Sequence, residues 1–291
     1  MTTASALRDL LAQPRLIVAP GAYDAISGRA IEAAGFPAVY MTGSGTAASL
    51  GFPDFGLLTM SEMVENAGVI ARSVSVPVIA DADTGYGNEL NVTRTVREYE
   101  SRGIAAIHIE DQVSPKRCGH LDGKEVVSRT EFVSKIRAAV EARRDRQFVI
   151  IARTDARAVV GMDEAIARAN EALDAGADVA FVEAAQSAEE LAQIPRLVKG
   201  PCLLNMVVGG KTPVVSLKDA EEMGYKIAIQ PGLLFRAAVA VFDAVLEDLN
   251  KSGLPKSAPN AGAFRDGFDR FGAREWEAIR ARGPAAQGGK S

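Results

Sequence analysis

Eight short apolar segments recur along the 291-residue chain, each followed by an amphipathic stretch with helical periodicity, and they constrain the fold more than any other feature. The segments are Leu16–Ala19, Ala38–Thr42, Val76–Ala80, Ala105–Ile109, Phe148–Ala152, Val179–Val182, Cys202–Val207 and Lys226–Ile229. Several are apolar at every position, as strands covered on both faces of a parallel sheet should be. Eight such βα units close into a barrel, so the sequence predicts a (β/α)8 barrel of the TIM type. An open doubly wound sheet is the alternative.

Glycines mark the predicted ends of several helices between these strands. The predicted helices Asp24–Ala34, Asn91–Arg102 and Asp163–Ala175 are each followed by a glycine, a common C-terminal stop. No Pro- or Ser-rich linker interrupts the first 250 residues, so we expect a single barrel domain over residues 1–291, with its core at about 15–250.

The C-terminal part of the sequence predicts a helical arm. A helix is expected at Leu233–Leu249, and residues 251–262 then contain Gly, Pro and Ser before an amphipathic stretch at 263–282. We interpret residues 251–282 as an arm that packs on a neighbouring subunit. Residues 283–291 are predicted to be disordered.

Composition and charge exclude several functional classes. The formal net charge is -4 and no basic block is present, which argues against binding nucleic acid. No run of about 18 apolar residues occurs, and the N-terminus lacks an apolar segment behind basic residues, so we expect a cytoplasmic protein without membrane contact. Two cysteines are too few for a disulfide framework.

Polar residues follow the predicted strands at the end where barrel enzymes place their active sites. They are Thr42–Gly45 after the second strand, Asp81 and Asp83 after the third, Glu110 and Asp111 after the fourth, Arg153–Asp155 after the fifth, Glu183 after the sixth, Asn205 after the seventh, and Gln230 and Pro231 after the eighth. The predicted fold therefore collects them into one ring.

Acidic residues in this ring indicate a divalent cation. Asp81, Asp83 and Glu110 would crowd negative charge at one mouth, a costly arrangement unless a cation neutralises it or some are protonated. Asp54 could reach the same place from its loop. Oxygen ligands without clustered His or Cys favour Mg²⁺, with Mn²⁺ as a substitute. The alternative is that these acids cap helices or pair with Arg and Lys.

The pentapeptide Lys116–His120 contains the sharpest local signal. Lys116, Arg117 and His120 surround Cys118, and such neighbours should favour the thiolate or prepare the thiol for proton transfer. A buried, inert Cys118 is the alternative. Cys202 opens a strand and is interpreted as structural.

Four segments together resemble the isocitrate lyase and phosphoenolpyruvate mutase superfamily. They are Asp81–Asn88, His108–Gln112, Lys116–His120 and Ala152–Ala156. The resemblance covers about Leu16–Leu249, and the Cys-containing pentapeptide is specific to the carbon-carbon lyase branches. It implies a Mg²⁺-dependent barrel whose last helix is swapped between subunits, usually in a homotetramer.

The resemblance also implies a reaction. The substrate would be a small 2-hydroxy dicarboxylate whose C2–C3 bond breaks by retro-aldol chemistry, giving an α-keto acid and a carboxylic acid. Cys118 would protonate the enolate-like fragment. Asp81 would bind the metal directly, while Asp54, Asp83 and Glu110 would hold metal-bound waters.

Substrate-binding residues are carried over in the same way. The resemblance implies that the backbone amides of Gly43 and Ser44, with the Thr42 hydroxyl, bind the keto-acid end, and that Arg153 grips a carboxylate. Glu183 and Asn205 match pocket-lining residues of the family.

Two further residues have open roles. His120 would orient the cysteine loop or contact the departing carboxylate. Tyr40 would either handle the hydroxyl proton or be a core residue, and the base for that proton is left unassigned.

Three observations bear on the branch within the family. Leu121–Lys124 lacks an arginine common in 2-methylisocitrate lyases, which favours two carboxylates over three. Asn205–Pro213 is closer to the 2,3-dimethylmalate lyase, oxaloacetate hydrolase and petal-death-protein branch. Val208 stands where both branches commonly have glutamate. We therefore expect a 2,3-dimethylmalate-like substrate, with 2-methylisocitrate lyase (pyruvate plus succinate) and then oxaloacetate hydrolase as alternatives; phosphonate chemistry and a non-enzymatic binding protein are weaker rivals.

Overall fold

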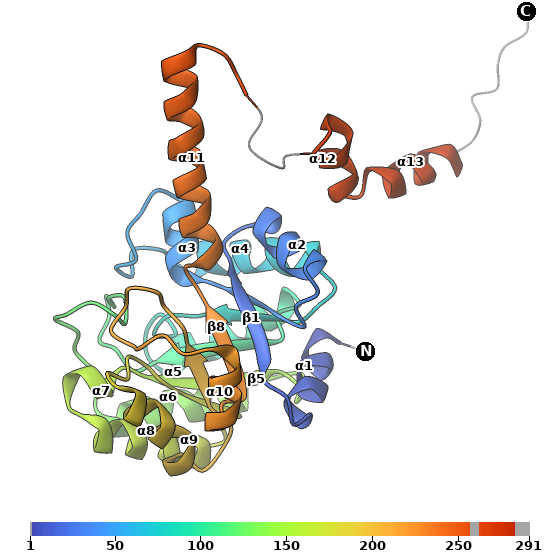
Figure 1. Cartoon of the computed structure of the whole chain (residues 1–291). Helices are drawn as coiled ribbons and strands as arrows, with labels where there is room; N and C mark the ends of the chain where they lie inside the picture. The colour runs from blue at the N-terminus through green and yellow to red at the C-terminus, as the bar shows by residue number, and fades with distance from the viewer. Residues whose placement is uncertain (1, 257–261, 283–291) are drawn as a thin grey trace, which may run out of the picture. The chain divides into compact units, whose positions relative to one another are not determined.

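Eight parallel strands form the centre of the protein in a computed structural model that describes residues 2–256 and 262–282 (Figure 1). The strands are β1 Ile17–Ala22, β2 Val39–Met41, β3 Val78–Asp81, β4 Ala106–Glu110, β5 Val149–Thr154, β6 Val179–Val182, β7 Leu203–Asn205 and β8 Ile227–Gln230. All eight predicted strands are present. Their spatial order is β6-β5-β4-β3-β2-β1-β8-β7, and a parallel bridge between Ala180 and Cys202 brings the two end strands together. The predicted (β/α)8 barrel is thus confirmed.

Helices alternate with the strands along the chain, and those between consecutive strands lie outside the strands (Figure 1). They are α1 Thr3–Ala12, α2 Ala25–Ala33, α3 Gly43–Ser49, α4 Met60–Ser73, α5 Glu89–Ser101, α6 Arg129–Ala142, α7 Ala156–Val159, α8 Met162–Asp174, α9 Ala188–Leu197, α10 Leu217–Met223, α11 Leu233–Ser252, α12 Phe264–Arg270 and α13 Ala273–Arg282. The three helices predicted from glycine stops begin and end within two residues of their predicted bounds.

Side chains at the helix starts explain where several helices begin. Asp24 precedes α2 and accepts a hydrogen bond from the Ser27 amide at 2.7 Å, while the Ser27 hydroxyl reaches back to the Asp24 amide. Thr59 and Glu62 make the same reciprocal arrangement at the start of α4. Each such cap satisfies amides that have no partner inside the helix, so it fixes the point at which the chain turns from loop to helix.

The core is divided by the barrel wall. Alternate strand residues, such as Ile79, Ile151 and Phe181, form a cluster that fills the barrel interior, and Leu7 of α1 joins it. The intervening residues, such as Val78 and Ile150, pack with the helices. At the C-terminal strand ends, beyond this apolar filling, some polar side chains, such as Asp81 and Asn205, line a cavity.

The chain divides into two compact units, Met1–Ala238 and a second that begins at Val239. The barrel belongs to the first unit, and the division falls within α11 rather than at residue 251. The second unit contains most of α11 together with α12 and α13, and none of these three helices has a buried residue. The amphipathic stretch predicted at 263–282 is two helices because Gly272 adopts a positive φ of 84° between them. The predicted disordered tail, residues 283–291, lies outside the described residues.

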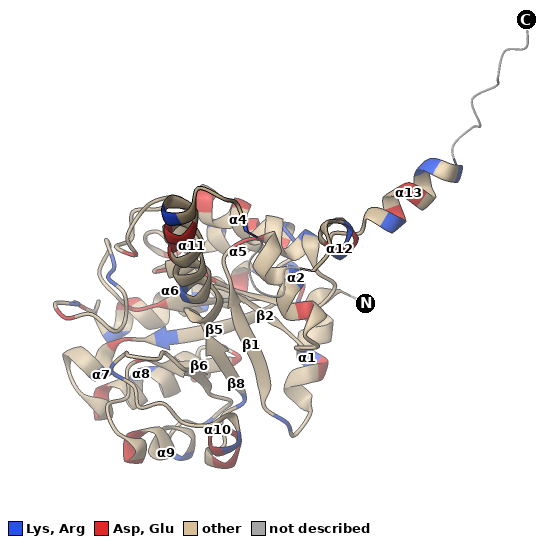
Figure 2. Cartoon of the chain, turned by 45° about the horizontal axis from the view of Figure 1, so that its top comes forward, with Lys and Arg blue, Asp and Glu red and all other residues tan. Residues whose placement is uncertain are grey.

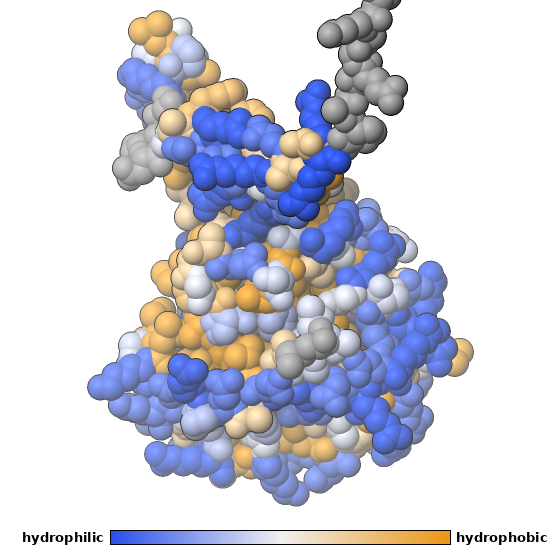
Figure 3. All heavy atoms as spheres, turned by 90° about the vertical axis from the view of Figure 1, so that its right-hand side faces the viewer, coloured by the Kyte–Doolittle hydropathy of each residue, from blue (hydrophilic) through white to orange (hydrophobic). Residues whose placement is uncertain are grey.

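Charged residues of both signs are distributed over the helices and loops, without a block of one sign (Figure 2). On the face shown in Figure 3, hydrophobic residues gather in patches between hydrophilic ones. Within residues 2–256 and 262–282, no helix combines the length and the hydropathy needed to cross a membrane.

Candidate active site

A cavity of about 200 Å³ lies at the C-terminal ends of the strands. Its lining residues are Tyr40, Thr42, Ser44, Asp54, Asp81, Lys116, Cys118, Gly119, His120, Arg153, Glu183, Asn205, Val207, Pro231, Gly232, Phe235 and Arg236. The predicted site residues that do not line it are Gly43, Asp83, Glu110 and Arg117. The ring predicted from the strand ends is therefore largely gathered around one space.

Lys116 connects two of the four predicted metal-binding acids. Its ammonium group lies 2.5 Å from Asp54 Oδ1 and 2.9 Å from Asp83 Oδ1, and its side chain is almost completely buried. Burial alone would lower the pKa of Lys116, but the charges of Asp83 and Asp54 raise it well above its ordinary value. This lysine is consequently a fixed cation.

Asp81 borders the cavity directly. Its Oδ1 accepts the Asp83 amide at 2.9 Å. Burial opposes its ionisation, yet His108, Lys116 and Arg153 lower the pKa of Asp81 to about 2. Burial, only partly offset by Lys116, raises the pKa of Asp83 to about 6. Both carboxylates are therefore mainly ionised at neutral pH, but only Asp81 stays ionised when the pH falls well below 6.

Glu110 is fully buried, and neither carboxylate oxygen has a hydrogen-bond partner among the described residues. Among the residues that the structure describes, Glu110 forms an ion pair only with Arg153, whose Nε lies 3.2 Å from Oε2. Burial raises the pKa of Glu110 well above its ordinary value. A buried carboxylate without donors is the kind of group that a cation or a metal-bound water satisfies.

These acids fit Mg²⁺ better than a metal that needs nitrogen or sulfur ligands. No group of three or more His, Cys, Asp or Glu side chains in residues 2–256 and 262–282 has the geometry of a complete metal site. Asp54 and Asp83 are taken up by Lys116, which leaves Asp81 and Glu110 as oxygen donors. A hard cation that keeps several waters needs only one or two such carboxylates.

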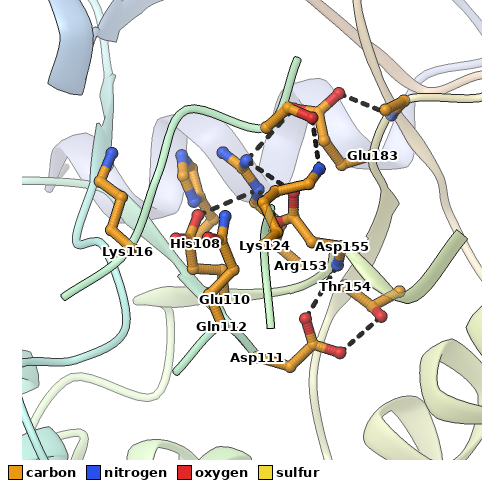
Figure 4. Close-up of polar contacts among 12 residues, drawn as sticks. His108, Glu110, Asp111, Gln112, Lys116, Lys124, Arg153, Thr154, Asp155 and Glu183 are labelled. Atoms are coloured by element: carbon orange, nitrogen blue, oxygen red, sulfur yellow. Dashed lines mark hydrogen bonds and ion pairs between the residues drawn. The ribbon is translucent and has the colours of Figure 1, made fainter. Parts of the chain in front are cut away.

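Arg153, which was expected to grip a substrate carboxylate, is surrounded by protein carboxylates (Figure 4). Besides Glu110, it pairs with Asp155 at 3.0 Å and Glu183 at 3.4 Å, and its guanidinium lies over the Phe181 ring at 5.1 Å. These contacts hold the guanidinium in one orientation at the cavity wall. They also neutralise its charge.

Lys124 ties the cysteine loop to the same network (Figure 4). Its side chain is 2% exposed, and its ammonium group pairs with Asp155 Oδ1 at 2.8 Å and donates to the Gly119 carbonyl. The chain at Gly119 lies so close to Arg153 and Glu183 that a side chain there would collide with them. The loop from 116 to 124 is therefore held against the strand ends.

Cys118 lines the cavity and is partly buried. Burial raises its pKa, and the charges of Arg153 and Lys116 only partly counteract that effect. The neighbouring Arg117 side chain is exposed and borders a different cavity. The thiol is thus protonated at neutral pH, which suits a proton donor rather than the thiolate that the charged neighbours in sequence suggested.

His120 is held in one tautomer by its surroundings. Its Nδ1 accepts the Lys211 amide at 3.1 Å, so the ring proton lies on Nε2, which faces Glu183 Oε1 at 3.5 Å. Burial lowers the pKa of His120 and keeps the ring neutral. Asn205 donates to Glu183 Oε2 at 2.9 Å, while its own buried carbonyl oxygen has no donor among the described residues. That oxygen is available to a hydroxyl or amide of a ligand.

Tyr40 lines the cavity beside Asp81. Its hydroxyl is 2.8 Å from His108 Nε2 and 3.5 Å from Asp81 Oδ2, and the two rings are stacked with centroids 5.8 Å apart. Burial, reinforced by Asp81, raises the pKa of Tyr40 well above its ordinary value. Burial lowers the pKa of His108 to about 4. Both groups are therefore neutral at pH 7.

The turn after β2 brings hydroxyls to the cavity. The Thr42 hydroxyl lies 3.0 Å from the Ser44 hydroxyl, and both residues line the space. Gly43 is packed against the Asp81 carboxylate, where any side chain would collide with it. Glycine at this position therefore allows the turn to approach Asp81.

Sequence reasoning missed several cavity residues. Val207, Gly232, Phe235 and Arg236 line the cavity, although only Asn205, Gln230 and Pro231 in this part of the chain were predicted for the polar ring. The available signal was position, since all of them lie within six residues of the end of the seventh or eighth strand. Val207 and Phe235 were not predicted because they are apolar, and Arg236 was not predicted because it lies in the helix α11.

A parallel barrel with a polar cavity at the C-terminal strand ends defines the chain as a barrel enzyme. The family model described as phosphoenolpyruvate phosphomutase matches residues 7–250. The chain belongs to the phosphoenolpyruvate mutase/isocitrate lyase superfamily, as its sequence motifs suggested.

Two relatives illustrate the similarity. A 2,3-dimethylmalate lyase of Eubacterium barkeri is 47% identical over 91% of this chain and 94% of its own length. A 2-methylisocitrate lyase of Aeropyrum pernix is 46% identical over 93% of this chain and 88% of its own length. The chain is thus similar to lyases that act on different acids.

Solved structures of other proteins are also similar to this chain. A crystal structure of 2,3-dimethylmalate lyase has a TM-score of 0.93 at 45% identity, covering 100% of this chain and 99% of that one. The structure of oxaloacetate acetylhydrolase bound to the inhibitor 3,3-difluorooxaloacetate has a TM-score of 0.92 at 40% identity, covering 96% of each chain. The structure of phosphonopyruvate hydrolase in complex with oxalate and Mg²⁺ has a TM-score of 0.88 at 33% identity, covering 97% of this chain and 99% of that one.

Proposed function

We propose that this protein is a Mg²⁺-dependent carbon-carbon lyase that cleaves a small 2-hydroxy dicarboxylate resembling 2,3-dimethylmalate. The observation that carries the proposal is that a protonated thiol, Cys118, and an ionised acid, Asp81, line one cavity. The similarity to 2,3-dimethylmalate lyase supports the choice of substrate.

In the proposed reaction the C2 hydroxyl passes its proton to a base, which is left unassigned, and from there to solvent; C2 becomes a carbonyl carbon, and the C2–C3 bond breaks. The bonding electrons pass to C3 as an enolate-like carboxylate. Cys118 donates its thiol proton to C3, and the products are an α-keto acid and a carboxylic acid. A thiol with a raised pKa suits this role because it is fully protonated before the step.

Asp81 and Glu110 would hold Mg²⁺, or Mn²⁺ in its place, directly or through water. When bound, the ion supplies positive charge that stabilises the oxygen anion on C2. Thr42 and Ser44 would orient the C2 carboxylate with their hydroxyls, and Asn205 would accept a hydrogen bond from the substrate.

The closest alternatives use the same residues. A 2-methylisocitrate lyase is favoured by the similarity to the Aeropyrum pernix enzyme, and an oxaloacetate hydrolase by the structural similarity to oxaloacetate acetylhydrolase. They differ from the main proposal in the groups on C2 and C3.

We also propose that α11–α13 pack on a neighbouring subunit, as part of a homotetramer. Support comes from large apolar side chains that lie exposed on these helices, among them Phe242, Phe264 and Trp276. Exposed apolar surface of this extent usually marks an interface. A cytoplasmic location is part of the proposal and rests on the sequence.

The test is a coupled assay for α-keto acid release from 2,3-dimethylmalate, 2-methylisocitrate, isocitrate, citramalate and oxaloacetate, with Mg²⁺ and with EDTA. Cys118→Ser should lose at least a hundredfold in kcat, while Cys202→Ser, which replaces a buried thiol away from the cavity, should keep wild-type activity. Turnover of 2,3-dimethylmalate above the other acids supports the proposal. Absence of Mg²⁺-dependent turnover with all five acids would overturn it.

A further inference from the structure

The cations on the cavity wall differ in how far the protein neutralises them. Lys116 pairs with two carboxylates and Arg153 with three. Arg236, which also lines the cavity, forms no ion pair with any of the described residues 2–256 and 262–282. An incoming anion therefore meets one cation whose charge is not already balanced.

Arg236 lies at the mouth of the cavity, in the first turn of α11, and its side chain is exposed. Its Nη1 donates to the Val208 carbonyl at 2.6 Å. That contact anchors the guanidinium but uses only one of its five N–H donors. The remaining donors form the planar fork that binds a carboxylate with two hydrogen bonds.

A second cavity of about 170 Å³ adjoins the first at this point. It is lined by Met206, Val207, Val208, Gln230, Gly232, Leu233 and Arg236. Val207, Gly232 and Arg236 belong to both cavities, so the two spaces meet beside the guanidinium. Apart from Gln230 and Arg236, the lining side chains are apolar.

Val208 determines the character of this junction. Its side chain is 65% exposed and lines the second cavity together with Arg236, so an apolar surface borders the guanidinium. Because residue 208 is not acidic, no carboxylate from the end of β7 competes for Arg236. The junction combines an unneutralised cation with an apolar wall.

We propose that this junction is a substrate subsite, in which Arg236 binds the second carboxylate and the adjoining cavity receives an alkyl substituent next to it. The inference rests on the proposed cleavage of a 2-hydroxy dicarboxylate and specifies its substrate class. Asp81 and the hydroxyls bind the C2 end deep in the cavity, and Arg236 binds the other end at the mouth. The chain then prefers alkyl-substituted diacids over unsubstituted ones.

The experiment measures binding by calorimetry with Mg²⁺ present, so it does not depend on turnover. The probes are oxalate, for the keto-acid end, and succinate, methylsuccinate, ethylsuccinate and propylsuccinate, for the subsite. Each added methylene should tighten wild-type binding about fourfold until the cavity is full. Arg236→Gln should weaken binding of every succinate tenfold to a hundredfold and change oxalate binding less than twofold.

Two further variants sharpen the result. Val208→Glu should weaken binding of the succinates, most strongly the longer ones, because its carboxylate would pair with Arg236 and narrow the apolar cavity. Arg94→Gln, an exposed arginine on α5, is the matched control and should bind all probes as wild type does.

Equal binding of the succinates by wild type and Arg236→Gln would overturn the subsite, as would equal weakening of oxalate. Absence of an alkyl preference would overturn its apolar half. If no hydroxy diacid is cleaved but succinate binding still depends on Arg236, the proposed reaction fails while the subsite stands.

Discussion

Lys124→Met should destabilise the protein and loosen the loop that carries Cys118. The Lys124–Asp155 pair has side chains 2% and 0% exposed, and removing one partner of a buried pair costs about 3–5 kcal/mol. Arg153 still neutralises Asp155 at 3.0 Å in the variant, so we expect the lower end, about 3 kcal/mol. If the lost stability is mainly that of the closed conformation of the loop 116–124, the fraction of molecules with an open loop rises up to about a hundredfold.

Two assays measure this effect, urea unfolding for stability and iodoacetamide alkylation of Cys118 for loop opening. Lys199→Met, which breaks an exposed pair with Asp174, should cost less than about 0.5 kcal/mol and serves as the control. Removing Asp155 as well, by Asp155→Asn, should make the loss from Lys124→Met smaller. A loss below about 0.5 kcal/mol for Lys124→Met, with unchanged alkylation, would refute the reasoning.

The effect of Lys124→Met should also depend on pH. Although burial opposes it, Arg153 and Lys124 lower the pKa of Asp155 to about 2, below its unfolded value of about 3.9. Stability from this carboxylate is therefore fully present above about pH 4 and is lost as the pH falls toward 2. The difference between wild type and variant should be constant from pH 5 to 8 and shrink at lower pH.

Three further outcomes follow from the site and the arm. Because burial raises the pKa of Cys118, kcat should stay level through neutral pH and fall only above the ordinary thiol range, and Cys118→Ser should lack this alkaline limb in a pH–rate profile. Asp81→Asn should abolish Mg²⁺ binding in calorimetry, whereas the exposed Asp174→Asn should leave it unchanged. Phe242→Glu should shift the protein to a smaller assembly in light scattering, and an unchanged mass would contradict the proposed role of α11.

The barrel could be predicted because its signal is local. Each strand is a run such as Phe148–Ala152, apolar on both faces, and only burial between helices and the barrel interior accommodates eight such runs. The second unit was harder, since the break at Gly272 depends on a backbone conformation that amphipathic periodicity does not reveal.

Most of the residues that line the cavity could be predicted from the sequence, but their charge interactions could not. The charged neighbours of Cys118 in sequence suggested either a thiolate or a thiol prepared for proton transfer, but Lys116 pairs with Asp54 and Asp83, and the Arg117 side chain is exposed. Burial therefore has the largest effect on the pKa of the Cys118 thiol and raises it. Adjacency in sequence says which charges are near, but only the fold determines which of them are already neutralised.

Arg236 also shows that the sequence alone does not reveal which cations are neutralised. Its sequence context is a helix with apolar neighbours, and nothing there distinguishes it from a surface arginine. Its importance arises from a comparison across the cavity, where the other cations are paired with carboxylates.

The most direct test of the proposed lyase is cleavage of 2,3-dimethylmalate in D₂O with Mg²⁺, followed by mass spectrometry of both products. The account predicts an α-keto acid released without solvent deuterium and a carboxylic acid carrying one deuterium at the carbon that was C3. Cys118→Ser should slow formation of that labelled acid at least a hundredfold. Turnover without C2–C3 cleavage, or a carboxylic acid without deuterium, would contradict the central claim.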